Sequence, residues 1–340
     1  MENLSLNIVT GRSEIIFGYY SERLNFLSKN RKIIVICDKN VNELYSDISK
    51  NYSVINITAL ESEKTIQIVE QIYIKLLELK ADRSTLLVAI GGGIICDITG
   101  YVAATFYRGL SVILIPTTLL AMVDASIGGK NGVNFNGNKN IVGVIRQPEA
   151  IIIDTTFLKT LPPEEFKNGI AEIIKHSIIS GGEFYNLILN NAELKSGIVS
   201  ENILQSAINI KINIVASDVN EKGLRKVLNF GHTLGHIIEL KQGISHGKAI
   251  AIGMMMSAII SAHFNKCSKK TVEEIYNLLT FYNLPVKSSL DIAEIVKYLN
   301  SDKKKDAELL HFVFIKNIGE IMHEGISINF LQNELLEIFK

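Results

Sequence analysis

The sequence predicts an N-terminal α/β domain with a mostly parallel sheet, residues 1–160, followed by an all-α C-terminal domain, residues 161–340. Before residue 160, short β-branched runs alternate with helical patterns, an order that is typical of βαβ units. After Leu161-Pro162-Pro163 the strand signals nearly vanish, and apolar residues recur at helical spacing. With 340 residues, 47% of them hydrophobic, the chain is long enough to form two domains with large cores.

In the first domain, the predicted strands are apolar runs that end in polar, glycine or proline residues. These strands are 32–37, 53–57, 85–90, 111–116 and 150–154, with a helix at 63–80 between the second and the third. In the second domain the predicted helices are 164–180, 200–218, 231–240, 247–264, 270–282, 291–301 and 331–339, with one stray strand at 311–315. Pro163 fits the first position of the opening helix, where its fixed φ is favourable.

Charge, cysteine content and the lengths of the apolar runs limit the possible partners and location of the chain. Lys+Arg and Asp+Glu each count 35, so no basic excess indicates a nucleic acid partner. The three cysteines, Cys37, Cys96 and Cys267, are far apart, which favours a reducing cytoplasm over a disulfide framework. No signal peptide is apparent at the N-terminus, and the longest apolar runs, such as 249–260, are too short to span a bilayer.

A glycine turn follows the predicted strand 85–90. Gly91, Gly92 and Gly93 lead into a helix that carries Asp97, and such a turn lets a phosphate approach a helix N-terminus. Asp38 and Asn40 follow the strand 32–37, at the end where open α/β sheets bind ligands. The same residues also fit a tight connection, a solvated acid on the helix and an Asx turn.

A second polar segment follows the strand 111–116. Its residues 131–140 are so rich in Gly and Asn that an irregular loop is predicted, and such loops are common at binding faces. Lys130, Lys139 and Arg108 could form a patch for an anionic substrate. Solvated lysines on a surface loop explain the spacing equally well.

The C-terminal domain holds the residues with the most evident chemistry. Glu172 and Lys175 lie one turn apart, His232 and His236 lie at i and i+4, and His246 follows. Nitrogen and carboxylate ligands that leave one position open are typical of a catalytic zinc site. From spacing alone, His232 and His236 are the natural pair of ligands, as in H-E-x-x-H sites.

Taken together and in this order, the motifs resemble those of the 3-dehydroquinate synthases, a family of sugar phosphate cyclases. The resemblance extends from about Asp38 to Lys304 and includes Gly91-Gly-Gly-x3-Asp97, Gly169-x-Ala-Glu172-x2-Lys175-His176 and Asn229-Phe-Gly-His232-Thr-x-Gly-His236. It implies a Rossmann-like NAD-binding domain and an active site in the cleft between the two domains. It also implies a homodimer, NAD and a divalent metal, Zn²⁺ or Co²⁺.

The resemblance assigns roles to residues. It implies metal ligands at Glu172, His232 and His246. It implies catalytic or substrate-binding roles for Arg108, Asp124, Lys130, Asn140, Lys175, Lys211, Arg225, Asn229, His236 and Lys304, with Arg108 contributed by a neighbouring subunit. It implies NAD contacts at Asp38, Asn40, Glu61, Lys64, Gly92, Gly93, Asp97, Thr117, Thr118, Lys139, Phe157 and Thr160. Lys304 lies in the run Asp302-Lys303-Lys304-Lys305, which leaves the matching lysine open to one residue.

The reaction implied is the conversion of 3-deoxy-D-arabino-heptulosonate 7-phosphate into 3-dehydroquinate in the shikimate pathway. It proceeds by transient oxidation with NAD, β-elimination of phosphate, re-reduction, ring opening and an intramolecular aldol closure. The first alternative is another cyclase such as 2-deoxy-scyllo-inosose synthase, whose substrate, glucose 6-phosphate, has no carboxylate for Arg225. A metal-dependent polyol dehydrogenase and an inactive NAD-binding regulator remain further alternatives.

Overall fold

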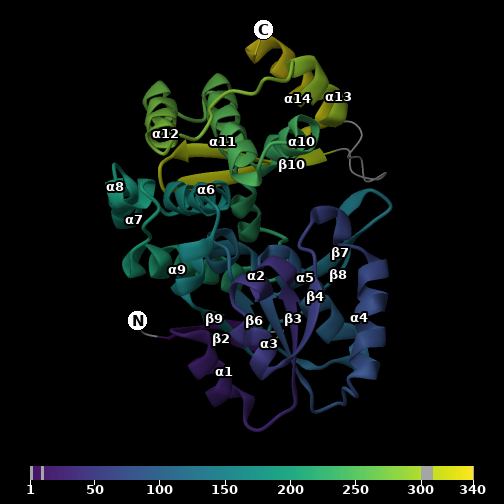
Figure 1. Cartoon of the computed structure of the whole chain (residues 1–340). Coiled ribbons are helices and arrows are strands. Elements are labelled where there is room, and N and C mark those ends of the chain that lie inside the picture. Colours follow the sequence, from purple (N-terminus) through teal and green to yellow (C-terminus); the bar gives the residue numbers. More distant parts are fainter. Residues whose placement is uncertain (1–2, 9–10, 300–308, 340) are drawn as a thin grey trace. The chain divides into compact units, whose positions relative to one another are not determined.

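The computed structural model describes residues 3–8, 11–299 and 309–339 of the chain (Figure 1). The chain forms two compact units. Unit 1 comprises Met1–Pro162 and Lys211–Val219, and unit 2 comprises Pro163–Ile210 and Asn220–Lys340. No helix among the described residues is long and apolar enough to cross a membrane.

Unit 1 contains the parallel sheet that the sequence predicts. The strands of the unit are β1 (Leu4–Ile8), β2 (Gly11–Phe17), β3 (Ile33–Asp38), β4 (Ser53–Ile57), β5 (Leu86–Gly91), β6 (Ser111–Pro116), β7 (Lys130–Phe135), β8 (Asn138–Ile145) and β9 (Ala150–Ile153). Its helices are α1 (Tyr20–Ser28), α2 (Lys39–Leu44), α3 (Asp47–Asn51), α4 (Ile66–Glu78) and α5 (Gly93–Thr105), with short turns η1 (Glu61–Glu63), η2 (Phe106–Arg108), η3 (Ala121–Ala125) and η4 (Thr155–Thr160).

The main sheet has the strand order β1-β2-β9-β6-β5-β3-β4, and only β1 runs antiparallel to its neighbour. Every residue of β5 is buried. Central parallel strands read as continuous apolar runs because both faces of the sheet are covered. The predictions of these strands and of a mostly parallel sheet are therefore confirmed.

The sheet reverses its direction of winding between β3 and β5. The chain passes from β3 outward to β4, then returns to the other side of β3 for β5 and continues to β6. Asp38 ends β3 and Gly91 ends β5, and the residues that precede them, Cys37 and Ile90, are register partners. Open α/β sheets bind ligands at such a reversal, at the carboxyl ends of the strands.

The prediction of an irregular loop at 131–140 is wrong. This segment forms most of an antiparallel hairpin, β7–β8, whose turn contains Asn136 with φ +49° and Gly137 with φ +78°. An Asn-Gly pair with both φ angles positive is the favoured two-residue hairpin turn. The Asn-Gly dipeptide was thus a hairpin signal within a segment whose composition resembles a loop. The antiparallel pair β1–β2 was also not predicted.

Unit 2 is mainly helical. Its elements are α6 (Pro163–Ser180), α7 (Gly182–Ile188), α8 (Ala192–Lys195), the first part of α9 (Glu201–Ser217), η5 (Leu224–Asn229), α10 (His232–Gln242), α11 (His246–His263), α12 (Lys269–Phe281), α13 (Ile292–Leu299), β10 (Leu309–Asn317), β11 (Glu320–Ser327) and α14 (Ile328–Ile338). Helix α11 is almost entirely apolar and largely buried, as its sequence predicts.

The description of the C-terminal domain as all-α is too strict. Where one stray strand was predicted, β10 and β11 form an antiparallel pair. Phe312 and Phe314 of β10 are buried in one core with side chains of α10, α11, α13 and α14. The hairpin tip contacts the end of α6, since the N–H of Gly319 donates to the carbonyl of Ile178 at 2.8 Å. A Cβ on Gly181 would lie 2.7 Å from the Cα of Gly319, so this contact requires glycine.

Candidate active site

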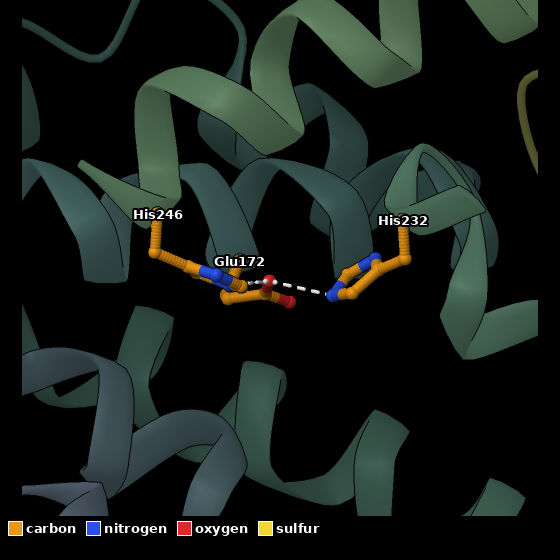
Figure 2. A group of neighbouring side chains, drawn as sticks. All are labelled: Glu172, His232 and His246. Carbon is orange, nitrogen blue, oxygen red and sulfur yellow. Dashed lines mark hydrogen bonds and ion pairs between the residues drawn. The ribbon is translucent and has the colours of Figure 1, made fainter. Parts of the chain in front are cut away.

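Three side chains of unit 2 converge on one point. Glu172 comes from the middle of α6, while His232 and His246 are the first residues of α10 and α11. Oε1 of Glu172 lies 3.4 Å from Nε2 of His232 and 3.3 Å from Nε2 of His246 (Figure 2). One ligand atom from each residue lies within 4.8 Å of the others. Two imidazole nitrogens and one carboxylate oxygen form the donor set of a catalytic zinc site.

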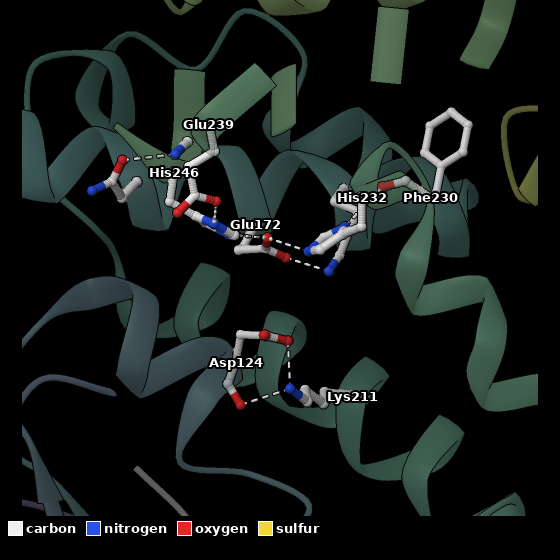
Figure 3. Close-up of polar contacts among 10 residues, drawn as sticks. Asp124, Glu172, Lys211, Phe230, His232, Glu239 and His246 are labelled. Atoms are coloured by element: carbon white, nitrogen blue, oxygen red, sulfur yellow. Dashed lines mark hydrogen bonds and ion pairs between the residues drawn. The ribbon is translucent and has the colours of Figure 1, made fainter. Parts of the chain in front are cut away.

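The second nitrogen of each imidazole has its own partner. Nδ1 of His232 lies 3.2 Å from the carbonyl oxygen of Phe230, and Nδ1 of His246 lies 3.1 Å from Oε2 of Glu239 (Figure 3). A carbonyl and a carboxylate accept hydrogen bonds, so each Nδ1–H donates and each Nε2 can present its lone pair. Such outer partners orient histidine ligands in metal sites. The arrangement therefore fits a bound divalent metal.

Charge reinforces this arrangement. Glu172 is fully buried and forms an ion pair with Lys175, one turn further along α6. Burial alone would raise the pKa of Glu172, but the Lys175 ammonium and the two imidazoles hold this pKa well below its ordinary value. Burial lowers the pKa of His232. Burial also opposes the charge on His246, yet Glu172 and Glu239 outweigh it and raise the pKa of His246 to about 9.

Helix α11 is fixed to α6 beside this group. Oδ1 of Asn168 accepts a hydrogen bond of 2.7 Å from the N–H of Gly247, which follows His246 directly. Asn168 lies four residues before Glu172, so both side chains share one face of α6. A Cβ on Gly247 would lie 2.7 Å from the Cα of Asn168, so only glycine permits this approach. The contact places His246 beside Glu172.

His236 takes a different position. Its ring lies edge-on to the ring of His232, with centroids 5.1 Å apart, and the residue is exposed. Its ligand atoms group with Glu239 and His246 and not with Glu172. The pair His232–His236 that spacing favours is therefore not the set that surrounds Glu172. The set implied by the resemblance is the one that geometry brings together.

Other predicted substrate residues of unit 2 lie on η5. Arg225 is buried there, and Nδ2 of Asn229 donates to Oε1 of Glu221 at 2.6 Å. The predicted Lys304 lies outside the described residues.

Unit 1 holds a second acid–base pair. Nζ of Lys211 lies 2.5 Å from Oδ1 of Asp124 and donates also to the carbonyl oxygen of Asp124 at 2.7 Å (Figure 3). Lys211 is only 6% exposed, so its ammonium is held in this pair and is not a solvated surface charge.

The glycine turn forms the expected helix N-terminus at the winding reversal of the sheet. Gly92 is the N-cap of α5 and Gly93 its first residue. A Cβ on Gly92 would lie 3.1 Å from Cγ2 of Thr118, so larger residues would crowd the turn. The N–H of Thr117 donates to the carbonyl of Gly91 at 3.0 Å. Asp38 caps α2 by accepting from the N–H of Asn40, as the Asx-turn alternative anticipates.

Three further residues that the resemblance assigns meet beside this turn. Nζ of the buried Lys64 donates to Oδ2 of Asp97 and to Oδ1 of Asn140, each at 2.5 Å. Burial raises the pKa of Asp97, and the Lys64 ammonium opposes this. Asp97 is thus an ion-paired residue with 20% of its side chain exposed, which contradicts the solvated-acid alternative.

The remaining predicted residues lie at exposed positions or pack against aromatic side chains of unit 1. Arg108, Lys130 and Lys139 are exposed. The Phe157 ring is buried and packs against Tyr20 and Tyr45. The hydroxyl of Thr160 lies 2.9 Å from that of Tyr45.

The sequence alone did not indicate three residues that organise these sites, Glu239, Asn168 and Asn134. Glu239 lies seven residues after His232 and Asn168 four before Glu172, so helical spacing could have suggested both. Asn134, whose Nδ2 donates to Oε1 of Glu61 at 2.8 Å, has no such signal, because Glu61 lies 73 residues earlier in the chain.

Comparisons with known proteins agree with the site. The model of the 3-dehydroquinate synthase N-terminal domain matches residues 54–168, and that of the C-terminal domain matches residues 169–305. A 3-dehydroquinate synthase of Ruminiclostridium cellulolyticum is 38% identical, over 92% of this chain and 91% of that protein. One from Dehalococcoides mccartyi is 36% identical, over 100% of this chain and 99% of the relative.

A solved structure shows the same fold. It is 2-deoxy-scyllo-inosose synthase in complex with carbaglucose-6-phosphate, NAD⁺ and Co²⁺, with a TM-score of 0.84 and 25% identity. The match covers 99% of this chain and 100% of that chain. By sequence, by fold and by the residues brought together around Glu172, this chain is an enzyme that belongs to the 3-dehydroquinate synthase family.

Proposed function

We propose that this chain converts 3-deoxy-D-arabino-heptulosonate 7-phosphate into 3-dehydroquinate and phosphate, with NAD⁺ and Zn²⁺ or Co²⁺ as cofactors. The observation that carries the proposal is the convergence of Glu172, His232 and His246, with each Nδ1 held by another acceptor. Family membership and the relatives named 3-dehydroquinate synthase support the reaction.

The N-terminal domain, residues 1–160, would bind NAD⁺, and the C-terminal domain, residues 161–340, the metal and the substrate. Glu172, His232 and His246 would hold the metal. The Gly92–Gly93 turn would receive the pyrophosphate at the N-terminus of α5. When bound, the metal polarises the substrate hydroxyl and NAD⁺ accepts its hydride reversibly.

The chain's own residues would bind and orient an anionic substrate. Lys175 and Arg225 are buried cations of unit 2, and Arg225 would bind the substrate carboxylate through a planar, bidentate contact. His236 would contact the phosphate. In unit 1 the Lys211 ammonium, fixed by Asp124, would bind substrate oxygen atoms. Holding one substrate through successive steps is chiefly a matter of such positioning.

We also propose a homodimer in which Arg108 reaches the site of the partner subunit. The exposure of Arg108 is compatible with this role. The three cysteines are free thiols, which supports a location in the reducing cytoplasm.

Phosphate release tests the proposal. The purified chain with NAD⁺ and Zn²⁺ is expected to release inorganic phosphate from the heptulosonate phosphate, and a chelator is expected to abolish the release. His232→Ala is expected to lose both metal and turnover. The matched control is His263→Ala, which removes a histidine paired with Glu334 at 2.7 Å. A metal content of one per His232→Ala chain would remove His232 from the ligand set.

A second substrate distinguishes the alternative cyclase. The fold shared with 2-deoxy-scyllo-inosose synthase makes glucose 6-phosphate the appropriate comparison. Phosphate release from glucose 6-phosphate in place of the heptulosonate phosphate would refute the dehydroquinate assignment.

A further inference from the structure

The hairpin β7–β8 has an irregular register at Asn134. Val133 pairs with Val142, but Phe135 pairs with Asn138. Asn134 of β7 is therefore opposite three residues of β8, 139–141. These extra residues have no register partner in β7. Asn140, in their middle, has a φ of +54°. β-Bulges of this kind redirect side chains and are frequent beside active sites.

Asn134 replaces the lost ladder bonds with its own polar groups. Its Oδ1 accepts from the N–H of Asn140 at 2.8 Å, inside the bulge. Its main-chain N–H donates to the carbonyl of Lys64 at 2.7 Å. Its Nδ2 donates to Oε1 of Glu61 at 2.8 Å and to the carbonyl of Glu61 at 3.1 Å. The residue thus joins the bulge to the segment around η1.

Lys64, which directly follows η1, also contacts the bulge. Its ammonium donates to Oδ1 of Asn140 and also pairs with Asp97 of α5. Asn134 and Lys64 therefore hold Asn140 from two directions, one by its main chain and one by its side chain. Through this ring of contacts the bulge, η1 and α5 keep a fixed register.

We infer that Asn134 is a positioning residue of the enzyme. It holds Glu61 and Lys64, to which we assign NAD contacts, and Asn140, to which we assign a substrate contact. The inference rests on the proposed function for the roles of these three residues. A carboxamide suits this position because it has both donors and an acceptor, whereas a carboxylate only accepts.

The position also predicts where a substitution acts. Asn134 is half-buried, and Glu61 and Asn140 are exposed, so their contacts contribute little to global stability. The contacts of Asn134 do fix the positions of Lys64 and Asn140. A substitution at Asn134 is therefore expected to change cofactor affinity more than thermal stability.

Asn134→Asp tests this in the full-length protein. It keeps the acceptor for the N–H of Asn140, removes both bonds donated to Glu61 and faces the Glu61 carboxylate with a second one. The NAD⁺ dissociation constant, measured by calorimetry, is expected to rise about tenfold. The control Asn138→Asp adds the same charge on the same hairpin, at an exposed residue whose Nδ2 donates to the carbonyl of Asn136 at 3.1 Å. It is expected to leave the constant within about twofold.

Rescue distinguishes a positioning role from a charge effect. In the double variant Asn134→Asp/Glu61→Gln, the amide introduced at position 61 can donate a hydrogen bond to the carboxylate introduced at position 134. The donor and the acceptor of the wild-type hydrogen bond are thus exchanged, and the hydrogen bond can form again. The double variant is expected to bind NAD⁺ more tightly than Asn134→Asp and than additivity of the two single variants predicts. Equal NAD⁺ affinity of wild type and Asn134→Asp, or strict additivity, would overturn the inference. A wild-type chain that binds NAD⁺ but releases no phosphate would refute the proposed function, while these affinities still decide the role of Asn134.

Discussion

Replacement of Glu172 by glutamine perturbs the most buried charge of the site. Glu172 is fully buried and its partner Lys175 retains only 2% of its side-chain exposure, so water cannot solvate the ammonium when the carboxylate is removed. Loss of one partner of a buried ion pair costs about 3–5 kcal/mol. The exposed pair Lys75–Glu78 has the same spacing of three residues, with 58% and 54% of the side chains exposed. Glu78→Gln is expected to cost less than about 1 kcal/mol.

Urea unfolding of the metal-free protein at neutral pH measures both costs. Metal-free protein is required, because bound metal would add its own contribution to the difference. The double variant Glu172→Gln/Lys175→Met removes both charges and is expected to recover most of the stability. If Glu172→Gln and Glu78→Gln lower the free energy of unfolding equally, the carboxylate is solvated in solution and the described burial of the pair is wrong.

Three further outcomes follow from the site. Lys175→Ala is expected to retain metal, because the three ligands remain, but to lose turnover by at least about a hundredfold; rates near those of the wild type would remove Lys175 from catalysis. Gly247→Ala places a Cβ 2.7 Å from the Cα of Asn168 and is expected to weaken zinc binding and lower the melting temperature, whereas Gly243→Ala has no atom within 4 Å of its Cβ and tests only the strain of a positive φ. The pKa of His246 is raised from 6.5 to about 9, so in metal-free protein this imidazole keeps its proton at neutral pH and zinc must displace it. Zinc affinity is therefore expected to rise about tenfold from pH 7 to pH 8 in a chelator competition, and an affinity independent of pH would contradict the contacts of His246 with Glu172 and Glu239.

The fold could be predicted where burial of apolar side chains determines the structure. The buried strands β3, β5, β6 and β9 are apolar runs bounded by polar, glycine or proline residues, so their sequence and their environment agree. The hairpin β7–β8 was predicted as a loop because most of its residues are polar or glycine, and even its buried positions include Asn131 and Gly132. Composition alone cannot separate such a hairpin from a loop.

The site was predictable in part. Spacing identified the histidines but favoured His236 over His246, because it cannot show which side chain faces Glu172. The resemblance supplied that choice. Glu239 contacts His246 and lies seven residues after His232, so helical spacing could have suggested its role. Asn134 contacts Glu61, which is far away in the chain, so its role follows only from tertiary structure.

Both histidines of the metal group are first residues of their helices, α10 and α11. A helix N-terminus carries roughly half a positive charge. Two such termini, the Lys175 ammonium and a divalent ion together exceed the two negative charges of Glu172 and Glu239, so the loaded site has a positive field. That field attracts a doubly charged phosphate ester before any contact forms, which makes the association rate fall as ionic strength rises. The start of each helix thus contributes to capture of the substrate as well as to the position of a ligand.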